Sequence, residues 1–183
     1  MKARAFIGMG SNICPEENVR AALLALARQE QIVAISTIYR TEPEGRPDQP
    51  DFYNCVVEIQ TEKTPEVLKY EVLRRIEDGL GRQRTSDKFA PRTIDLDLML
   101  YDDLVLNTHN LVLPDPEIAS RSFLAAGLSE LAPELTLPGT GSRVAELAAC
   151  LPHGNMHPLE DYTARIKSDL YFLGGVSYLS SMR

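Results

Sequence analysis

The sequence lacks the features that mark several large classes of protein. It has no apolar run close to the ~20 residues that a membrane-spanning helix needs, so we expect no membrane association. Residues 1–6 lead directly into a strand pattern and lack the apolar core of a signal peptide. The cysteines, Cys14, Cys55 and Cys150, are widely spaced and form no Cys-x-x-Cys pair. This pattern favours reduced thiols in a cytoplasmic protein over disulfides or a zinc site.

Glycine-rich phosphate-binding motifs are also missing. Gly8 and Gly10 follow an apolar strand pattern, but the third glycine of a dinucleotide-binding turn is absent, and we expect only a tight turn over residues 8–12. No Gly-Lys-Ser/Thr occurs, which excludes a P-loop. There is no internal repeat and no low-complexity tract.

The composition is that of an ordinary globular protein, with 44% hydrophobic and 25% charged residues. A length of 183 residues suits one domain with a real core and an appendage. The net charge of −7 and the pI of about 5.0 argue against general nucleic-acid binding. Basic residues nevertheless gather in residues 82–92, which matches a small anionic ligand better than a duplex.

Apolar and acidic residues alternate in residues 94–100, which predicts a β-strand. We expect its buried face to consist of Ile94, Leu96, Leu98 and Leu100. Asp95 and Asp97 share the opposite face, with Cα atoms about 6.6 Å apart. Aspartate is depleted in strands, and adjacent carboxylates repel unless a cation lies between them. Mg²⁺ is the natural candidate, because it takes carboxylates, waters and phosphate oxygens.

The loop before this strand supplies positive charge from Arg82, Arg84, Lys88 and Arg92. A guanidinium fork suits phosphate oxygens. Each feature alone has an ordinary explanation, since one face of a strand is often wet and a basic loop is usually solvated. Together, joined by the turn at residues 91–93, they indicate metal-assisted handling of a polyphosphate.

The pattern along the chain predicts a β-α-β-β-α-β order, which is the ferredoxin-like α+β fold. The expected strands are residues 3–9, 32–39, 52–60 and 94–100, and the expected helices are residues 16–30 and 64–80. On the second helix we expect an inward face of Val67, Tyr70, Leu73 and Ile76. Residues 40–51 carry three prolines and a glycine and must form a long loop. Further helices are expected at residues 120–131 and 144–149.

We divide the chain into a main domain, residues 1–152, and a C-terminal helical extension, residues 153–183. In the extension, apolar residues recur at helical spacing: Leu159, Tyr162, Ile166, Leu170 and Leu173. This stripe predicts a docking helix, packed against its own domain or a second subunit. His153 and His157 have metal-like spacing, but nearby prolines and the lack of a third ligand argue against zinc.

Residues 92–98, Arg-Thr-Ile-Asp-Leu-Asp-Leu, resemble the signature of the 6-hydroxymethyl-7,8-dihydropterin pyrophosphokinase family. Supporting matches fall in family order at residues 10–12, 39–43, 48–54, 113–114 and 121–123. The resemblance implies the ferredoxin-like fold and an enzyme of folate biosynthesis. It implies transfer of the β,γ-diphosphate of ATP to the hydroxymethyl group of 6-hydroxymethyl-7,8-dihydropterin, with AMP as the other product.

The resemblance also implies roles for single residues. Asp95 and Asp97 would hold two Mg²⁺ ions and, with Arg82 and Arg92 on the phosphates, form the catalytic set. The nucleotide site would comprise Glu77, Arg84, Lys88 and Arg121, with Arg74 and Asp115 at positions where the family usually has glutamine and histidine. The pterin would stack between Phe52 and Phe123 and be read by Thr41, Glu42, Glu44 and Asn54. Phe89 stands in the closing loop where relatives often have tryptophan.

Other functions share the same element order, including RNA-recognition modules and small-molecule regulatory domains. An RNA reader needs exposed aromatics on its central strands and a basic surface, whereas this chain has an acidic strand there. A regulator needs no pair of strand aspartates opposite an arginine loop. An inactive family member stays open as a further alternative. We therefore expect ATP and the pterin as partners, no nucleic acid, and a monomer or homodimer.

Overall fold

The computed structural model describes residues 1–183 except 44, 47, 88, 153–154 and 173–183. Its main sheet is antiparallel in the order β5 (Asp95–Tyr101), β1 (Ala3–Ser11), β4 (Phe52–Thr61). The far edge of β4 is shared by β2 (Gln31–Ile35) and β3 (Tyr39–Thr41), and β8 (Met156–Pro158) pairs with β3. This is the expected ferredoxin-like order, and the predicted fold class is confirmed.

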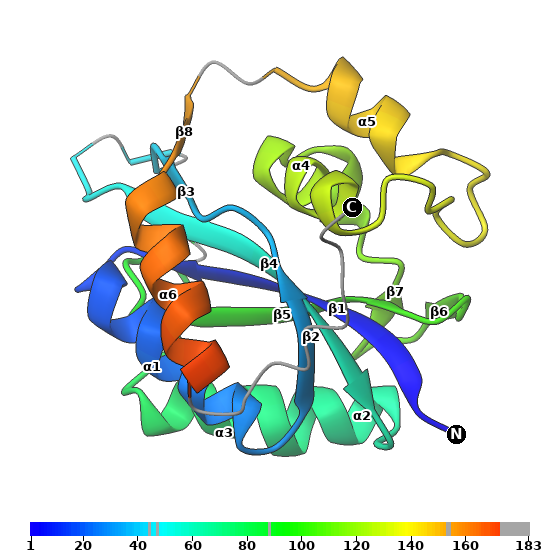
Figure 1. The fold of residues 1–183 in the computed structure, drawn as a ribbon, viewed down its shortest axis with the longest axis horizontal. Coiled ribbons are helices and arrows are strands. Elements are labelled where there is room, and N and C mark those ends of the chain that lie inside the picture. The colour runs from blue at the N-terminus through cyan, green and yellow to red at the C-terminus, as the bar shows by residue number, and fades with distance from the viewer. Residues whose placement is uncertain (44, 47, 88, 153–154, 173–183) are drawn as a thin grey trace.

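Helices cover both faces of the sheet (Figure 1). One face carries α1 (Pro15–Ala27), α6 (Glu160–Phe172) and a continuous helical segment made of α2 (Pro65–Val67), the π-helix η1 (Leu68–Leu73) and α3 (Arg74–Gly79). The other face carries α4 (Ser122–Leu131) and α5 (Val144–Cys150). A 3₁₀ turn, η2 (Pro116–Ala119), precedes α4, and β6 (Leu106–Asn107) pairs with β7 (Val112–Leu113).

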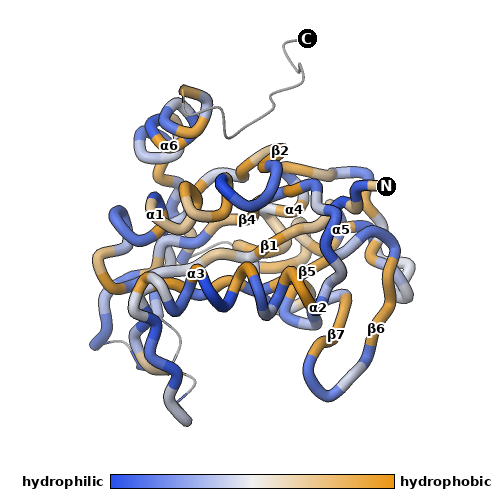
Figure 2. Tube along the Cα trace, turned by 90° about the horizontal axis from the view of Figure 1, so that it is seen from below, coloured by the Kyte–Doolittle hydropathy of each residue, from blue (hydrophilic) through white to orange (hydrophobic). Residues whose placement is uncertain are grey.

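Local sequence explains where the helices begin. Pro15 opens α1 and is followed by two glutamates, whose charge complements the helix dipole. Thr64 caps α2 by accepting a hydrogen bond from the Val67 N–H, and Pro65 fills the first position, where no N–H is needed. Figure 2 shows that hydrophobic residues run along the central strands, whereas α3 and α6 alternate hydrophobic and hydrophilic residues, as expected of helices that cover a sheet.

The prediction of which side chains of the strand at residues 94–100 share one buried face is correct for the first part of the strand and wrong at its end. Ile94, Leu96 and Leu98 pack in the core beneath α1 and α3. Leu100 belongs to the opposite core, under α4, and this prediction was wrong. The pairing of β5 with β1 shifts register at Phe6/Ile7, which inserts one extra residue and reverses the alternation beyond it. Asp95 and Asp97 precede the shift and keep the predicted common face.

The expected inward face of the helix at residues 64–80 was wrong at Val67, which is 40% exposed. Leu68 and Val72 are buried in its place, alongside the predicted Leu73 and Ile76. The wider turns of the π-helix rotate the side chains relative to a regular α-helix, so a 3.6-residue period cannot predict this face.

Two further predictions need correction. Gly8 and Gly10 lie within β1, which runs straight to Ser11, so the expected tight turn at residues 8–12 is wrong. The single strand expected at residues 32–39 is two strands, β2 and β3, separated by residues 36–38.

Among the described residues, no helix is long and apolar enough to cross a membrane. All three cysteines are free.

The C-terminal extension packs on the main domain through α6. Tyr162, Ile166 and Leu170 are buried in the core cluster that also holds α1, and Leu159 packs against it. The Tyr162 hydroxyl donates to the Glu16 carbonyl at 2.6 Å. Leu173 and His153 lie outside the described residues. His157, the other member of the metal-like pair, is an exposed residue of β8.

Candidate active site

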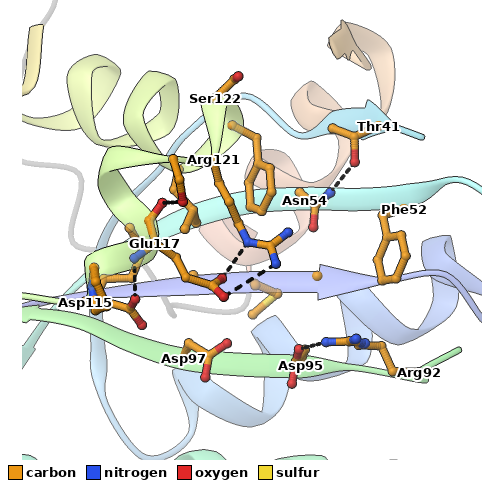
Figure 3. A pocket seen from close by; sticks show the side chains of 18 of the residues that line it. Thr41, Phe52, Asn54, Arg92, Asp95, Asp97, Asp115, Glu117, Arg121 and Ser122 are labelled. Atoms are coloured by element: carbon orange, nitrogen blue, oxygen red, sulfur yellow. Dashed lines mark hydrogen bonds and ion pairs between the residues drawn. The ribbon is translucent and has the colours of Figure 1, made fainter. Parts of the chain in front are cut away.

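A pocket of about 960 Å³ lies between the start of α4 and the strands β1, β4 and β5 (Figure 3). Its floor includes Gly8 and Gly10 of β1, which present no side chain. A Cβ atom on Gly10 would lie 2.5 Å from Oδ1 of Asn54, so this glycine is required by close packing in a strand. Among the candidate site residues, the pocket is lined by Thr41, Glu42, Phe52, Asn54, Phe89, Arg92, Asp95, Asp97, Asp115, Arg121 and Phe123.

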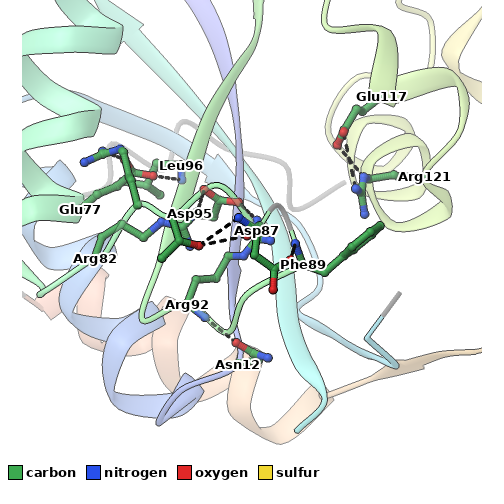
Figure 4. A network of polar contacts seen from close by, with 12 residues as sticks. Asn12, Glu77, Arg82, Asp87, Phe89, Arg92, Asp95, Leu96, Glu117 and Arg121 are labelled. Atoms are coloured by element: carbon green, nitrogen blue, oxygen red, sulfur yellow. Dashed lines mark hydrogen bonds and ion pairs between the residues drawn. The ribbon is translucent and has the colours of Figure 1, made fainter. Parts of the chain in front are cut away.

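Asp95 stands between two arginines. Its Oδ1 atom lies 3.1 Å from Nη2 of Arg82, and its Oδ2 atom is paired with Arg92 (Figure 4). Nε of Arg82 is buried and, within the described part of the chain, has no hydrogen-bond partner. A buried unused donor is costly, so this N–H favours donating to an anionic oxygen, but Arg82 itself does not line the pocket.

Asp97 has the opposite environment. Its carboxylate faces the pocket, and among the described residues it has no hydrogen bond or ion pair. The side chain of Asp97 is exposed to the open pocket, but the protein packed around it removes part of its hydration. This desolvation and the negative charges of Asp95, Asp115, Glu77 and Glu117 raise the pKa of Asp97 to about 7. A cation in the pocket would relieve this repulsion.

Asp115 and Arg121 stand on the opposite wall. Oδ1 of Asp115 accepts the Glu117 N–H at 2.8 Å, which caps η2, and Glu117 pairs with Arg121 one turn later. Burial is the main reason that the pKa of Asp115 is raised, and the nearby charge of Glu117 adds to it. The positive charges of Lys69 and Arg121 act in the opposite direction.

Aromatic and amide groups form the other end of the pocket. Phe52 and Phe123 are partly buried, and Cζ of Arg92 lies 5.6 Å from the Phe52 ring centroid. Asn54 is almost fully buried and donates from Nδ2 to Oγ1 of Thr41 at 2.7 Å. This end therefore offers flat apolar surfaces beside fixed polar atoms, which suits a heteroaromatic ring.

Two loops that frame the pocket are tied together through Asn12, which is only 1% exposed. Its Nδ2 donates to Oε1 of Gln49 at 3.1 Å, and its Oδ1 accepts the Arg92 N–H at 2.8 Å. Gln49 in turn donates to the Phe89 carbonyl at 2.8 Å. No role in holding these loops was predicted for Asn12 from the sequence. The available signal was a polar residue directly after an otherwise buried strand.

Three nucleotide-site candidates do not line the pocket. Glu77 is buried behind β5, where Oε1 accepts the Leu96 N–H at 2.9 Å and Oε2 pairs with Arg84 (Figure 4). Arg84 also pairs with Asp78, and Arg74 lies over the Tyr70 ring at 4.5 Å. These residues support the strand and helix around the site instead of facing it. Glu44 and Lys88 lie outside the described residues.

The pocket also contains residues that sequence reasoning did not include: Lys69, His109, Pro152, Asn155 and Met156. The last three stand at or beyond the predicted domain boundary. No sequence pattern links them to the strands that they approach. Among the described residues, no group of three or more His, Cys, Asp or Glu side chains is arranged to hold a metal ion. A metal held here would need oxygens from its ligand or from water as well as from Asp95 and Asp97.

Fold and pocket together define an α+β protein whose site joins carboxylates, arginines and aromatic rings. A family model for 7,8-dihydro-6-hydroxymethylpterin-pyrophosphokinase matches residues 6–133. A 2-amino-4-hydroxy-6-hydroxymethyldihydropteridine pyrophosphokinase of Methylorubrum extorquens is 40% identical over 158 residues, covering 82% of this chain and 96% of the relative. The Haemophilus influenzae enzyme of the same name is 37% identical over 139 residues, covering 74% and 86%.

This chain therefore belongs to the 7,8-dihydro-6-hydroxymethylpterin-pyrophosphokinase family. Its function is that of the family, pyrophosphoryl transfer to hydroxymethyldihydropterin in folate biosynthesis. Solved structures agree on the fold. A crystal structure of an HPPK-DHPS protein with substrates has a TM-score of 0.64 at 12% identity, and one of Plasmodium falciparum HPPK-DHPS has 0.65 at 14%. The two matches cover 81% and 92% of this chain, but only 43% and 45% of the longer proteins.

Proposed function

We propose that this chain transfers the β,γ-diphosphate of ATP as one unit to the hydroxymethyl oxygen of the pterin, with two Mg²⁺ ions held by Asp95 and Asp97. The observation that carries the metal assignment is the pair of carboxylates, Asp95 and Asp97, which both face the pocket from one side of β5. Two carboxylates plus waters and phosphate oxygens are a donor set that suits Mg²⁺. When bound, Mg²⁺ neutralises charge on the transferring group and activates the attacking oxygen.

The ion pairs around Asp95 supply the phosphate-binding groups. Arg82 and Arg92 both pair with the Asp95 carboxylate. Phosphate oxygens would take over the two guanidinium groups, since arginine forks match them well. Asp95 would then be released toward the cations. Because the cations would replace the two guanidinium groups as partners of Asp95, its negative charge would stay neutralised throughout.

The remaining pocket residues place the acceptor. Phe52 and Phe123 would hold the two faces of the pterin, and Asn54 with Thr41 would bind its polar edge. Diphosphate transfer requires little covalent participation from the protein, so holding the hydroxymethyl oxygen in line with the attacked phosphorus provides much of the rate. Arg121, on the far wall, would contact the triphosphate. A cytoplasmic location and a monomeric or homodimeric state complete the proposal.

The direct test supplies MgATP and 6-hydroxymethyl-7,8-dihydropterin and follows the nucleotide products. We expect AMP and diphosphorylated pterin in equal amounts, with formation abolished by a chelator of Mg²⁺. The 6-methyl analogue, which lacks the acceptor oxygen, is the control and should release no AMP. Formation of ADP would show single phosphoryl transfer, and the same rate in chelator would remove the metals from the proposal.

Replacing Gly10 by alanine should weaken pterin binding. The new Cβ would meet Oδ1 of Asn54 at 2.5 Å, so the amide must move away from Thr41. Loss of that alignment should raise the Kd for pterin roughly three- to ten-fold, measured by calorimetry. Gly79→Ala is the control, because a Cβ there meets nothing within 4 Å. Equal pterin affinity in Gly10→Ala and wild type would contradict the assignment of Asn54.

A further inference from the structure

The C-terminal extension reaches the pocket through an added strand. β8 pairs with β3 in antiparallel register, with Met156 opposite Thr41 and His157 opposite Arg40. β3 ends at Thr41 and is followed directly by Glu42, and both residues line the pocket. Figure 1 shows β8 beside β3, directly before α6. β3 has only three residues and lies between β4 and β8, so its pairing with β8 influences where it lies.

The same extension holds the residue that precedes β3. Ile38 is fully buried in the break between β2 and β3. Its N–H donates to Oγ1 of Thr163 at 2.9 Å, and its carbonyl accepts the Leu159 N–H at 2.8 Å. Both backbone polar groups of Ile38 are thus satisfied by the extension, which is the condition for burying them. The start of β3 is therefore fixed by α6 and the turn before it.

A side-chain contact extends this support into the pocket. Nδ2 of Asn155 donates to Oε2 of Glu42 at 2.9 Å, and both residues line the pocket with Met156. A hydrogen bond from an amide to a carboxylate is charge-assisted and directional. Asn155 therefore limits the rotamers of a glutamate that is otherwise exposed to solvent.

We propose that Asn155 and Met156, just before and at the start of β8, form the outer wall of the pterin subsite, with Asn155 as a positioning residue that holds the Glu42 carboxylate toward the edge of the bound ring. The amino and ring N–H groups of a pterin are donors, and a fixed carboxylate is a matching acceptor. Asn155 acts through Glu42 and touches no reacting atom. This inference rests on the proposed function, since it assigns the extension to the binding of that reaction's acceptor.

The test measures steady-state kinetics of the full chain and of Asn155→Ala. We expect the KM for pterin to rise roughly three- to ten-fold, while kcat and the KM for MgATP stay at wild-type values. His157→Ala is the matched control, because it truncates an exposed β8 side chain that does not line the pocket. Thermal unfolding of both variants should match wild type, which separates positioning from a general loss of structure.

A double-mutant cycle then asks whether Asn155 acts through Glu42. In a Glu42→Ala background, Asn155→Ala should change the pterin KM by less than about two-fold. A full additional effect, or a wild-type KM in Asn155→Ala alone, would overturn the inference. Calorimetric titration of pterin, in the presence of Mg²⁺ and a non-hydrolysable ATP analogue, repeats the cycle without turnover. A wild-type chain that binds pterin with this coupling but forms no AMP would refute the proposed reaction and retain the subsite.

Discussion

Asp97→Asn should lose at least ~10²-fold in turnover and at the same time become more stable at pH 8 than the wild type. The first effect follows from removing a charge that the proposed metals need. The second follows from the surroundings of Asp97, where desolvation by the protein around the pocket and four neighbouring carboxylates disfavour the ionised form and raise its pKa to about 7. A residue that weakens the fold and serves the reaction is the expected signature of a functional site.

The pH dependence of this stability difference has a definite sign. An aspartate in the unfolded chain has a pKa of about 3.9. With a folded-state pKa of about 7, protonation of Asp97 favours the folded state; this contribution is fully present below the unfolded pKa and is lost as the pH rises through 7. Asparagine does not titrate. The Tm of Asp97→Asn minus that of wild type should therefore be larger at pH 8 than at pH 5, in the absence of Mg²⁺.

Asp95→Asn is the matched comparison, because it changes the neighbouring carboxylate of the same strand face. Asp95 is already neutralised by Arg82 and Arg92, and its loss leaves two guanidinium groups without their shared partner. We expect the same loss of turnover but a lower Tm instead of a higher one. Near-normal turnover in either variant would contradict the assignment of both aspartates as metal ligands. A Tm difference for Asp97→Asn that is independent of pH would refute the electrostatic explanation.

Predictions from the sequence succeeded where a local pattern controls the structure. The element order of the sheet followed from strand and helix periodicity, and the common face of Asp95 and Asp97 followed from alternation over three residues. The same reasoning was wrong at Leu100 and Val67. A bulge in β5 and a π-helix after α2 each change the period, and both depend on pairing or packing with distant segments.

The residues that line the pocket were predictable in part, where a local sequence motif contains them. Most of the candidate residues that line it were recognised from contiguous family-like motifs around residues 41–54, 92–97 and 121–123. Asn155 lies 113 positions from its partner Glu42, and no periodicity or motif connects the two. Glu77 is close to the site residues in sequence, but its side chain binds the Leu96 N–H of β5, a contact that the tertiary structure sets. Long-range pairing of this kind is not encoded in a local pattern.

Ile166→Ala should lower the free energy of unfolding by about 2–4 kcal/mol, because it removes a side chain that is 1% exposed in the core shared by α6 and α1. Tyr162 and Leu170 flank it on the same buried face, so the helix has little freedom to close the cavity. Urea unfolding followed by far-ultraviolet circular dichroism gives the free energy and its dependence on urea. Ser168→Ala, on the exposed face of α6, is the control and should stay within about 0.5 kcal/mol of wild type.

The number of transitions in that experiment decides whether the extension is a part of the main domain. Its apolar face belongs to the same buried cluster as Leu23 of α1 and Ile59 of β4, and its first turn fixes Ile38. We therefore expect α6 to unfold together with the sheet, in one transition that coincides for circular dichroism and tyrosine fluorescence. Ile166→Ala should shift this single transition to lower urea without splitting it. An early, separate loss of helix signal with an unchanged main transition would make residues 153–183 an independent appendage.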